Sequence, residues 1–172
     1  MRPIFLAFVA SLLPGVMAAS ECPRDKILSG AAETSLAGID VHRDKMPDVR
    51  QRFGKPSKAK WILDEGSSWA KYKWVRDQTA LGVSGSKDDT HIVQVSGPEP
   101  KELPGTGKGL ALGDPFARAE ALYGSTYVDG FVTGPEIGEK TRTYCFADGT
   151  ELSVGLDDAD RVTAIRLTVP TD

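Results

Sequence analysis

The stretch GIDVHRDKMPDVRQRFG, residues 38–54, recurs in outline as GLALGDPFARAEALYG at residues 109–124, and this repetition decides the expected fold. An aspartate, two apolar residues, an aromatic residue and a glycine match at a constant offset of 70 positions. The matched pairs are Asp44 and Asp114, Met46 and Phe116, Val49 and Ala119, Phe53 and Tyr123, and Gly54 and Gly124. Aspartate can cap the first backbone amides of a helix, apolar residues three or four positions apart form one helical face, and glycine supplies a left-handed stop. Each stretch therefore predicts a short amphipathic helix.

Segments in which apolar and polar residues alternate follow each predicted helix. Strands are expected at 72–74, 81–83 and 92–95 after the first helix, and at 144–146, 152–154 and 164–167 after the second. Asp148-Gly149 is a two-residue turn signal between two strands of the second set. The predicted fold class is α+β, with two tandem units that each pack a short helical segment on an antiparallel meander sheet.

Residues 97–108 separate the two units, because this segment holds three prolines and three glycines. Such a composition is typical of a linker. We expect a first unit with an N-terminal arm at 19–96, a linker at 97–108 and a second unit at 109–172. Units of about 70 residues are marginally stable alone, so the two are expected to pack side by side with roughly continuous sheets.

The first 18 residues have the features of a secretory signal peptide. Arg2 is the only charge before an apolar stretch at 4–16, and Val16 and Ala18 occupy the positions expected for cleavage after Ala18. The apolar stretch is too short to span a bilayer comfortably, and no later segment is long enough. The mature protein is therefore expected to be secreted or periplasmic, with no membrane span.

The composition of the chain excludes some classes of partner. Its 172 residues are 40% hydrophobic and 26% charged, with a net charge of −3, which is typical of a soluble globular protein. No basic excess is available to neutralise phosphates, so no nucleic-acid partner is expected.

The two cysteines predict one structural disulfide between Cys22 and Cys145. An even pair in an oxidising compartment usually forms a bond, and this bond would join the N-terminal arm to the second half of the chain. The competing interpretation is a reactive thiol. The apolar neighbours of Cys145, and the lack of a Cys-x-x-Cys motif, favour the structural role.

The strand alternation also predicts which side chains share a face. If Tyr144 and Phe146 face the helices, the residues of the second half that face away from them are Thr143, Cys145, Ser153, Ala164 and Arg166. In the first half, the residues that face away are Trp69, Lys71, Lys73 and Gln94. This outer side is expected to stay open. Two lysines beside a tryptophan suggest an acidic partner surface.

Two tandem units with these helices, and an aromatic-x-Asp-Gly turn in the second, make the chain resemble the secreted beta-lactamase inhibitory proteins. A single unit is also similar to the small envelope lipoproteins of the outer-membrane assembly machinery. The resemblance extends from about Leu36 to Val169. It implies that an open, concave sheet face grips a target protein, here through Trp69, Lys71, Lys73, Thr143, Cys145 and Arg166.

Four patterns that could carry chemistry have simpler interpretations. Ser68-Trp69-Ala70-Lys71 has the spacing of serine acyl-enzymes, but it lies in a predicted strand and lacks the accompanying Ser-Asp-Asn and Lys-Thr-Gly motifs. DDAD at 157–160 lacks the glycine and glutamate of an EF-hand loop. GTGKG at 105–109 resembles a phosphate loop but has no Ser or Thr after its lysine. His42 and His91 have no second ligand at metal spacing.

The three tryptophans complete the set of candidate contact residues. Trp74 matches Phe146 and is expected in the core, whereas Trp69 has the opposite parity and Trp61 lies in the predicted helix-to-strand connection. The candidate partner-binding residues are Trp61, Trp69, Lys71, Lys73, Thr143 and Arg166. No catalytic residue, metal or cofactor is predicted.

The sequence thus predicts a module that binds another extracytoplasmic protein, in the first interpretation as an enzyme inhibitor. A cell-envelope assembly or scaffold factor is the alternative. An unrecognised hydrolase is the second alternative.

Overall fold

The computed structural model describes residues 22–64, 67–76, 78–86, 89–97, 103–130, 137 and 140–170. The predicted signal peptide, at 1–18, lies outside the described residues. No helix in the described segments is long and apolar enough to cross a bilayer.

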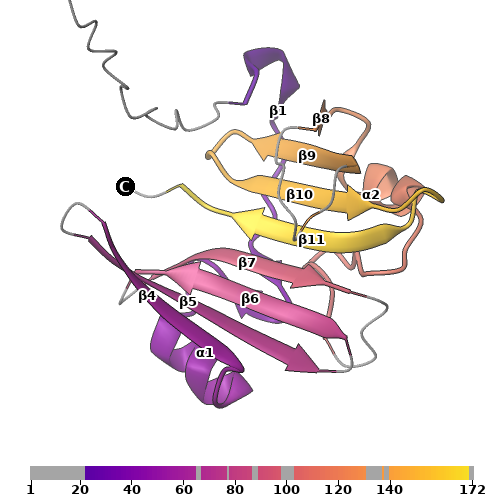
Figure 1. The fold of residues 1–172 in the computed structure, drawn as a ribbon. Helices are drawn as coiled ribbons and strands as arrows, with labels where there is room; N and C mark the ends of the chain where they lie inside the picture. The colour runs from indigo at the N-terminus through magenta and orange to yellow at the C-terminus, as the bar shows by residue number, and fades with distance from the viewer. Residues whose placement is uncertain are drawn as a thin grey trace, which may run out of the picture.

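One large sheet dominates the fold (Figure 1). Its strands run in the order β1-β9-β10-β11-β7-β6-β5-β4, with β8 paired to β9. The first half contributes β4 (Lys58–Asp64), β5 (Ser67–Arg76), β6 (Thr79–Gly85) and β7 (Thr90–Ser96). The second half contributes β8 (Val128–Asp129), β9 (Lys140–Phe146), β10 (Glu151–Leu156) and β11 (Val162–Thr168), and the N-terminal arm contributes β1 (Ile27–Leu28).

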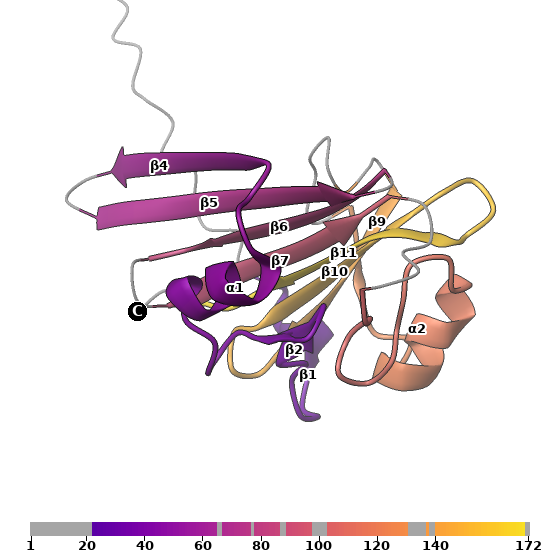
Figure 2. The same ribbon diagram turned by 90° about the horizontal axis from the view of Figure 1, so that it is seen from below.

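The remaining elements are short. A 3-10 helix, η1 (Arg24–Lys26), precedes β1, and a two-stranded hairpin joins β2 (Ser35–Leu36) to β3 (Ile39–Asp40). The two α-helices are α1 (Met46–Phe53) and α2 (Phe116–Tyr123). Figure 2 shows both helices on the same side of the large sheet. We call this the helix side, and the opposite side the outer side.

The predicted fold class is wrong, because the two halves do not form separate helix-plus-meander units. The last strand of each half pairs with the other: β11 lies antiparallel to β7 over five residue pairs, from Ala164↔Ser96 to Thr168↔Ile92. These backbone hydrogen bonds merge the strands into a mixed, nine-stranded sheet, and one core cluster spans both halves. The chain is a β-rich fold with two short helices. Whether its halves descend from a repeat stays a prediction.

The local predictions fared better than the global one. All six predicted strands lie within β5, β6, β7, β9, β10 and β11, and the two predicted helices are α1 and α2. Gly54 and Gly124 follow these helices with φ of 75° and 91°, values that favour glycine. The short strands β1, β2, β3 and β8 and the longer β4 were missed, and Trp61 therefore lies within β4 and not in a connection.

The predicted aspartate caps are also wrong. Asp44 accepts a hydrogen bond from the backbone N–H of Asp40, and Asp114 accepts one from the N–H of Ala111. Both side chains therefore close the turn before the helix. The first turn of α1 is instead bonded through Asp48, whose carboxylate accepts the N–H of Lys45.

The core lies between the helices and the sheet. From α1, Met46 and Val49 are buried, and α2 buries Phe116, Ala119 and Tyr123. The ring of Tyr123 stacks at 5.3 Å from that of Tyr144, which is fully buried in β9. Burying one such large side chain contributes on the order of 2 kcal/mol. Trp74 and Phe146 are both buried, as their matched positions predicted.

The predicted disulfide is confirmed. Cys22 and Cys145 are bonded across a sequence separation of 123 residues. Just after Cys22, β1 pairs in parallel with β9, with Ile27 opposite Cys145. The bond and the short parallel ladder together fix the N-terminal arm along the β9 edge of the sheet.

Candidate functional site

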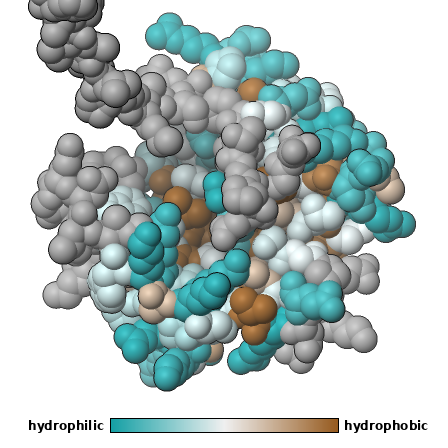
Figure 3. All heavy atoms as spheres, in the orientation of Figure 1, coloured by the Kyte–Doolittle hydropathy of each residue, from teal (hydrophilic) through white to brown (hydrophobic). Residues whose placement is uncertain are grey.

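Four lysines lie together on the outer side of β4 and β5. Lys58 and Lys60 of β4 stand directly opposite Lys73 and Lys71 of β5, and directly opposed residues share a face. Tyr72, between the two β5 lysines, is buried on the helix side, so the lysines point outward. Three are exposed and Lys73 is half-buried. We call these four residues the lysine face; Figure 3 shows hydrophilic residues over this part of the sheet.

Trp69 extends the lysine face toward the start of β5. It lies two residues before Lys71, and alternate residues of a strand share a face. Its ring is half-buried and sits 5.0 Å from the ring of His91 in β7, tilted by 43°. The imidazole Nδ1 of His91 is buried, with no hydrogen-bond partner within the described part of the chain. The stacking contact holds the indole on the outer side while part of its surface remains exposed.

Arg166 lies further across the same side. It pairs in register with Gln94, and its Nε and Nη2 donate to Gln94 Oε1 at 2.9 and 2.7 Å. Gln94 stands opposite Gly82, which in turn stands opposite Lys73. The structure thus places Arg166 in one row with Lys73, three strands away.

Trp61 belongs to the other side of the sheet. It stands opposite Ala70 in β5, and its ring meets that of the buried Tyr72 at 6.4 Å. Its side chain is 59% exposed. A flat partner surface laid on the lysine face would not touch this residue.

The outer side of the second half is covered, contrary to the expectation of an open face. Thr143 is completely buried, and its hydroxyl shares a hydrogen bond of 3.0 Å with Ser153, which is 1% exposed. The carbonyl of Ile137 lies against Gly155, where an added Cβ would come within 1.9 Å of that oxygen. Thr143 therefore offers no surface to a partner.

The disulfide and a carboxylate occupy the same outer side near β9. Glu151 stands opposite Cys145 in the register of β9 and β10, and its Oε1 lies 3.6 Å from the Sγ of Cys22. Partial burial raises the pKa of Glu151. The outer side therefore changes from exposed cations on β4 and β5 to buried polar groups on β9 and β10.

A second polar cluster, which sequence analysis missed, surrounds Glu33. This carboxylate is 3% exposed and accepts the backbone N–H groups of Thr34, Ser35, Gly107 and Lys108 at 3.0–3.1 Å. The hydroxyl of Tyr123 donates to Glu33 Oε2 at 2.7 Å. Burial raises the pKa of Tyr123, so its hydroxyl stays protonated as a donor.

The Glu33 cluster explains the GTGKG sequence at 105–109. Backbone amides in such a loop can cradle an anion, and here the anion is a carboxylate of the same chain. An added Cβ at Gly107 would come within 2.7 Å of Glu33 Oε1, so the loop needs glycine there. Residues 103–108 of the predicted linker thus include a contact that anchors the loop to the segment before β2.

Lys58 and Lys60 were not predicted as site residues, although the sequence around them carries a signal for a strand. KAKW at 58–61 alternates charged and uncharged residues as a strand does, but alanine and lysine are weak strand formers. Among the described residues, no group of three or more His, Cys, Asp or Glu side chains could hold a metal ion.

Comparisons with known proteins give a fold but no family. No family model matches, and no curated protein matches significantly. An extracellular protein containing an SCP domain from Bacillus anthracis strain Ames aligns with a TM-score of 0.51 and 11% identity, over 86% of this chain and 50% of that one. A cysteine-rich secretory protein from Staphylococcus aureus Mu50 aligns with a TM-score of 0.49 and 12% identity, over 73% of this chain and 42% of that one.

The chain thus spans half or less of the length of these two proteins. A Streptococcus mutans protein described as a candidate beta-lactamase inhibitor aligns with a TM-score of 0.36 and 12% identity, over 79% of this chain and 89% of that one. At such identities a likeness concerns the fold alone. Of the three, only the Bacillus anthracis protein, with its TM-score of 0.51, supports a likeness of fold.

Proposed function

We propose that the chain is an extracytoplasmic binding module whose lysine face contacts an acidic surface of another protein. The observation that carries this proposal is the presence of two pairs of directly opposed lysines, Lys58 with Lys73 and Lys60 with Lys71. Like charges directly opposite each other across a sheet destabilise it. The exposed pair Lys60 and Lys71, in a chain with net charge −3, therefore bears a cost in stability, which a binding role would offset.

Protection of a sheet edge does not account for all four lysines. Lysines on an edge strand do discourage pairing between sheets, and β4 is an edge strand. Lys71 and Lys73, however, lie on β5, which is paired on both sides. Only Lys58 and Lys60 could serve the protective purpose.

Trp69 supplies the apolar part of the proposed contact. Tryptophan is enriched among the residues that dominate binding energy at interfaces, and the contact with His91 limits the side-chain entropy that binding would cost. The lysines would chiefly accelerate association and select acidic partners. The proposed contact surface is Trp69, the lysine face and Arg166, without Trp61 and Thr143.

The proposed compartment and partner class follow from the disulfide. A bond such as Cys22–Cys145 persists outside the reducing cytosol. We therefore propose a secreted or periplasmic location and an extracytoplasmic protein partner. Inhibition of an enzyme is the specific form that the sequence resemblance implies, and a role in envelope assembly is the alternative.

Binding is proposed in preference to catalysis. Ser68 and Lys71 lie in a β-strand, so the one-turn helical spacing that Ser-x-x-Lys enzymes use is absent. Turnover by the purified protein that Ser68→Ala or His91→Ala abolished would favour the hydrolase alternative.

Charge reversal on the lysine face tests the proposal. Wild type, Lys60→Glu/Lys71→Glu and the control Arg24→Glu/Lys45→Glu would each be immobilised and exposed to extracytoplasmic extract at low salt. The control reverses the same charge at exposed positions away from the lysine face. We expect an acidic protein that wild type and control capture, that the lysine-face variant loses, and that salt releases.

Capture of the same proteins by all three forms would contradict the proposal. Anionic phosphatidylglycerol vesicles would be tested in parallel. Binding to vesicles that depends on the lysine face, without a captured protein, would replace the protein partner with a membrane surface.

A further inference from the structure

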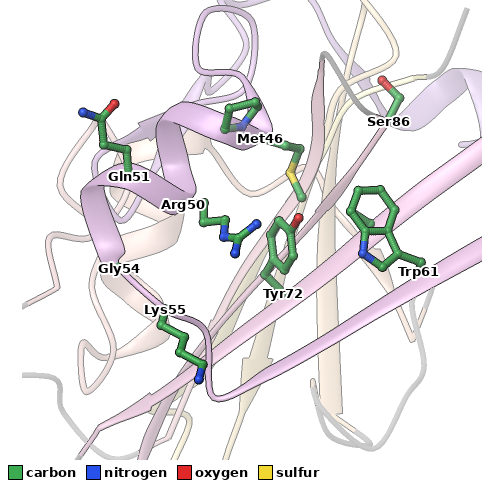
Figure 4. Close-up of a pocket in the computed structure, with 10 residues that line it drawn as sticks. Met46, Arg50, Gln51, Gly54, Lys55, Trp61, Tyr72 and Ser86 are labelled. Carbon is green, nitrogen blue, oxygen red and sulfur yellow. The ribbon is translucent and has the colours of Figure 1, made fainter.

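A pocket of about 660 Å³ lies on the helix side, between α1, strands β4 and β5, and Ser86 just after β6. Its lining includes Met46, Arg50, Lys55, Trp61, Ala70 and Tyr72 (Figure 4). Small-molecule sites usually measure about 300–1,000 Å³. The pocket is separated from the lysine face by the sheet itself, so it is independent of the proposed protein contact.

Two aromatic rings form a corner in this pocket. The planes of Trp61 and Tyr72 meet at 89°, with centroids 6.4 Å apart. Tyr72 is buried to 7% exposure and forms a floor, whereas Trp61 is 59% exposed and forms an upright wall. An indole that is mostly exposed contributes little to the core, so its position is better explained by a flat group packed against it.

Positive charge lines the opposite wall. The guanidinium of Arg50 lies 6.0 Å from the centre of the Tyr72 ring, and in Figure 4 it points toward that ring. Lys55 adds a second cation, and the described lining contains no aspartate or glutamate. An aromatic corner without these cations would suit a positively charged ligand. With them, a cationic ligand is repelled and an anionic one attracted.

We propose that this pocket binds a small molecule that carries a flat apolar ring and an acidic group. The ring packs into the corner of Trp61 and Tyr72. The acidic group faces the guanidinium of Arg50, and Lys55, which also lines the pocket, adds positive charge. Met46, 3% exposed, closes the base with a polarisable side chain that adapts to ring edges.

Naphthalene-2-sulfonate is the probe for this proposal, and the naphthyl-2-methylammonium cation is its matched control. Binding to the full chain would be measured by calorimetry and by the fluorescence of the tryptophans. We expect the anion to bind about 10-fold more tightly than the cation. Trp61→Leu should weaken the anion about 10-fold and Arg50→Gln several-fold, because each removes one of the two recognition elements.

Variants on the outer side give the matched controls. Trp69→Leu and Lys71→Gln remove a tryptophan and a cationic side chain on the opposite face, and both should bind the probe as wild type does. Trp61→Phe keeps a ring and should retain most of the affinity, and circular dichroism would check that every variant is folded.

Three results would overturn the proposal. They are absence of binding at millimolar probe, equal affinity for the anion and the cation, and equal loss from Trp69→Leu and Trp61→Leu. If Trp61→Leu failed to fold, the comparison of Trp61→Phe with Arg50→Gln would decide, since only the latter should lose the preference for the anion.

Discussion

The two halves of the large sheet share the same alternation of residues along their strands, but the outer side is exposed in the first half and buried in the second. In the first half, the outer side of β4 and β5 carries exposed lysines, whereas in the second half the outer side of β9 and β10 carries buried threonine and serine hydroxyls. The sequence assigned Lys71, Lys73, Thr143 and Ser153 to this side but did not predict Lys58 and Lys60. The difference is that the second half is covered by other parts of the chain, so parity along a strand fixes a face but not its exposure.

The two edges of the sheet also differ, because one is covered and the other is open among the described strands. The β9 edge is paired with β1 and β8 and is tied by the disulfide, whereas β4 is unpaired on its outer edge among the described strands. An unpaired edge is a site where another chain can approach. The lysine face and the pocket, the two proposed sites, both lie at the β4 end of the molecule.

Removal of the disulfide, which ties down only the β9 edge, is expected to have the largest effect on stability. Cys22→Ser/Cys145→Ser should lower the free energy of unfolding by about 3 to 5 kcal/mol, because the bond closes a loop of 123 residues in the unfolded chain. Urea unfolding with and without dithiothreitol measures this effect. Wild type should become less stable on reduction, and the double variant should not change. An equal response of both forms would show that the bond does not contribute.

Loss of the Glu33 charge is the next largest expected effect. Glu33→Gln should destabilise the fold by about 2 to 4 kcal/mol, because an amide nitrogen would face backbone N–H donors in a buried site. Urea unfolding of this variant would be compared with Asp25→Asn, which makes the same carboxylate-to-amide change at an exposed position of the N-terminal arm. A cost no larger than that of the control would show that the loop does not depend on this carboxylate.

The aspartates that precede the two helices, Asp44 before α1 and Asp114 before α2, differ in their contacts. Burial of Asp44 opposes its ionisation, but hydrogen bonds from Arg52 and the Asp40 amide, and the charges of Arg52 and Arg43, together lower its pKa from the ordinary value of 3.8. A depressed pKa in the folded state stabilises the fold above the ordinary value, and this contribution is lost as the pH falls through the depressed value.

Asp44→Asn should therefore cost about 1 kcal/mol or less near pH 7, with a smaller cost near pH 2. Thermal unfolding at the two pH values measures this difference. Asp114→Asn, at the matched position, is the control, and it should cost less at pH 7 because the contact described for Asp114 is the Ala111 amide. Equal costs of Asp44→Asn at both pH values would exclude the ion pair as a source of stability.

The smallest expected effect has the opposite sign. Lys60→Glu places an acid opposite Lys71 and should raise the free energy of unfolding by about 0.5 kcal/mol. Arg24→Glu, an exposed charge reversal outside the lysine face, should change stability less. If Lys60→Glu were neutral or destabilising, the opposed lysines would bear no cost, and the main support for a binding role would be lost.

Sequence reasoning succeeded where neighbouring residues suffice. The spacing of Met46 and Val49 identified a helical face, and the alternation around Tyr144 identified a strand, because both depend on local geometry. The disulfide was also predictable, since two cysteines in an oxidising compartment leave one pairing. Glu33 gave no signal, because its partners at Gly107 and Lys108 are 74 and 75 positions away.

The sequence by itself determined the helices, six strands of the sheet, the facing of their side chains and the covalent bond between Cys22 and Cys145. Only the tertiary structure decided that the strands form one sheet, that Thr143 is covered while Lys71 is exposed, and that Trp61 forms a pocket with Tyr72. The physical reason is that helix and strand periods arise from adjacent residues, whereas sheet order and burial depend on contacts between segments far apart along the chain.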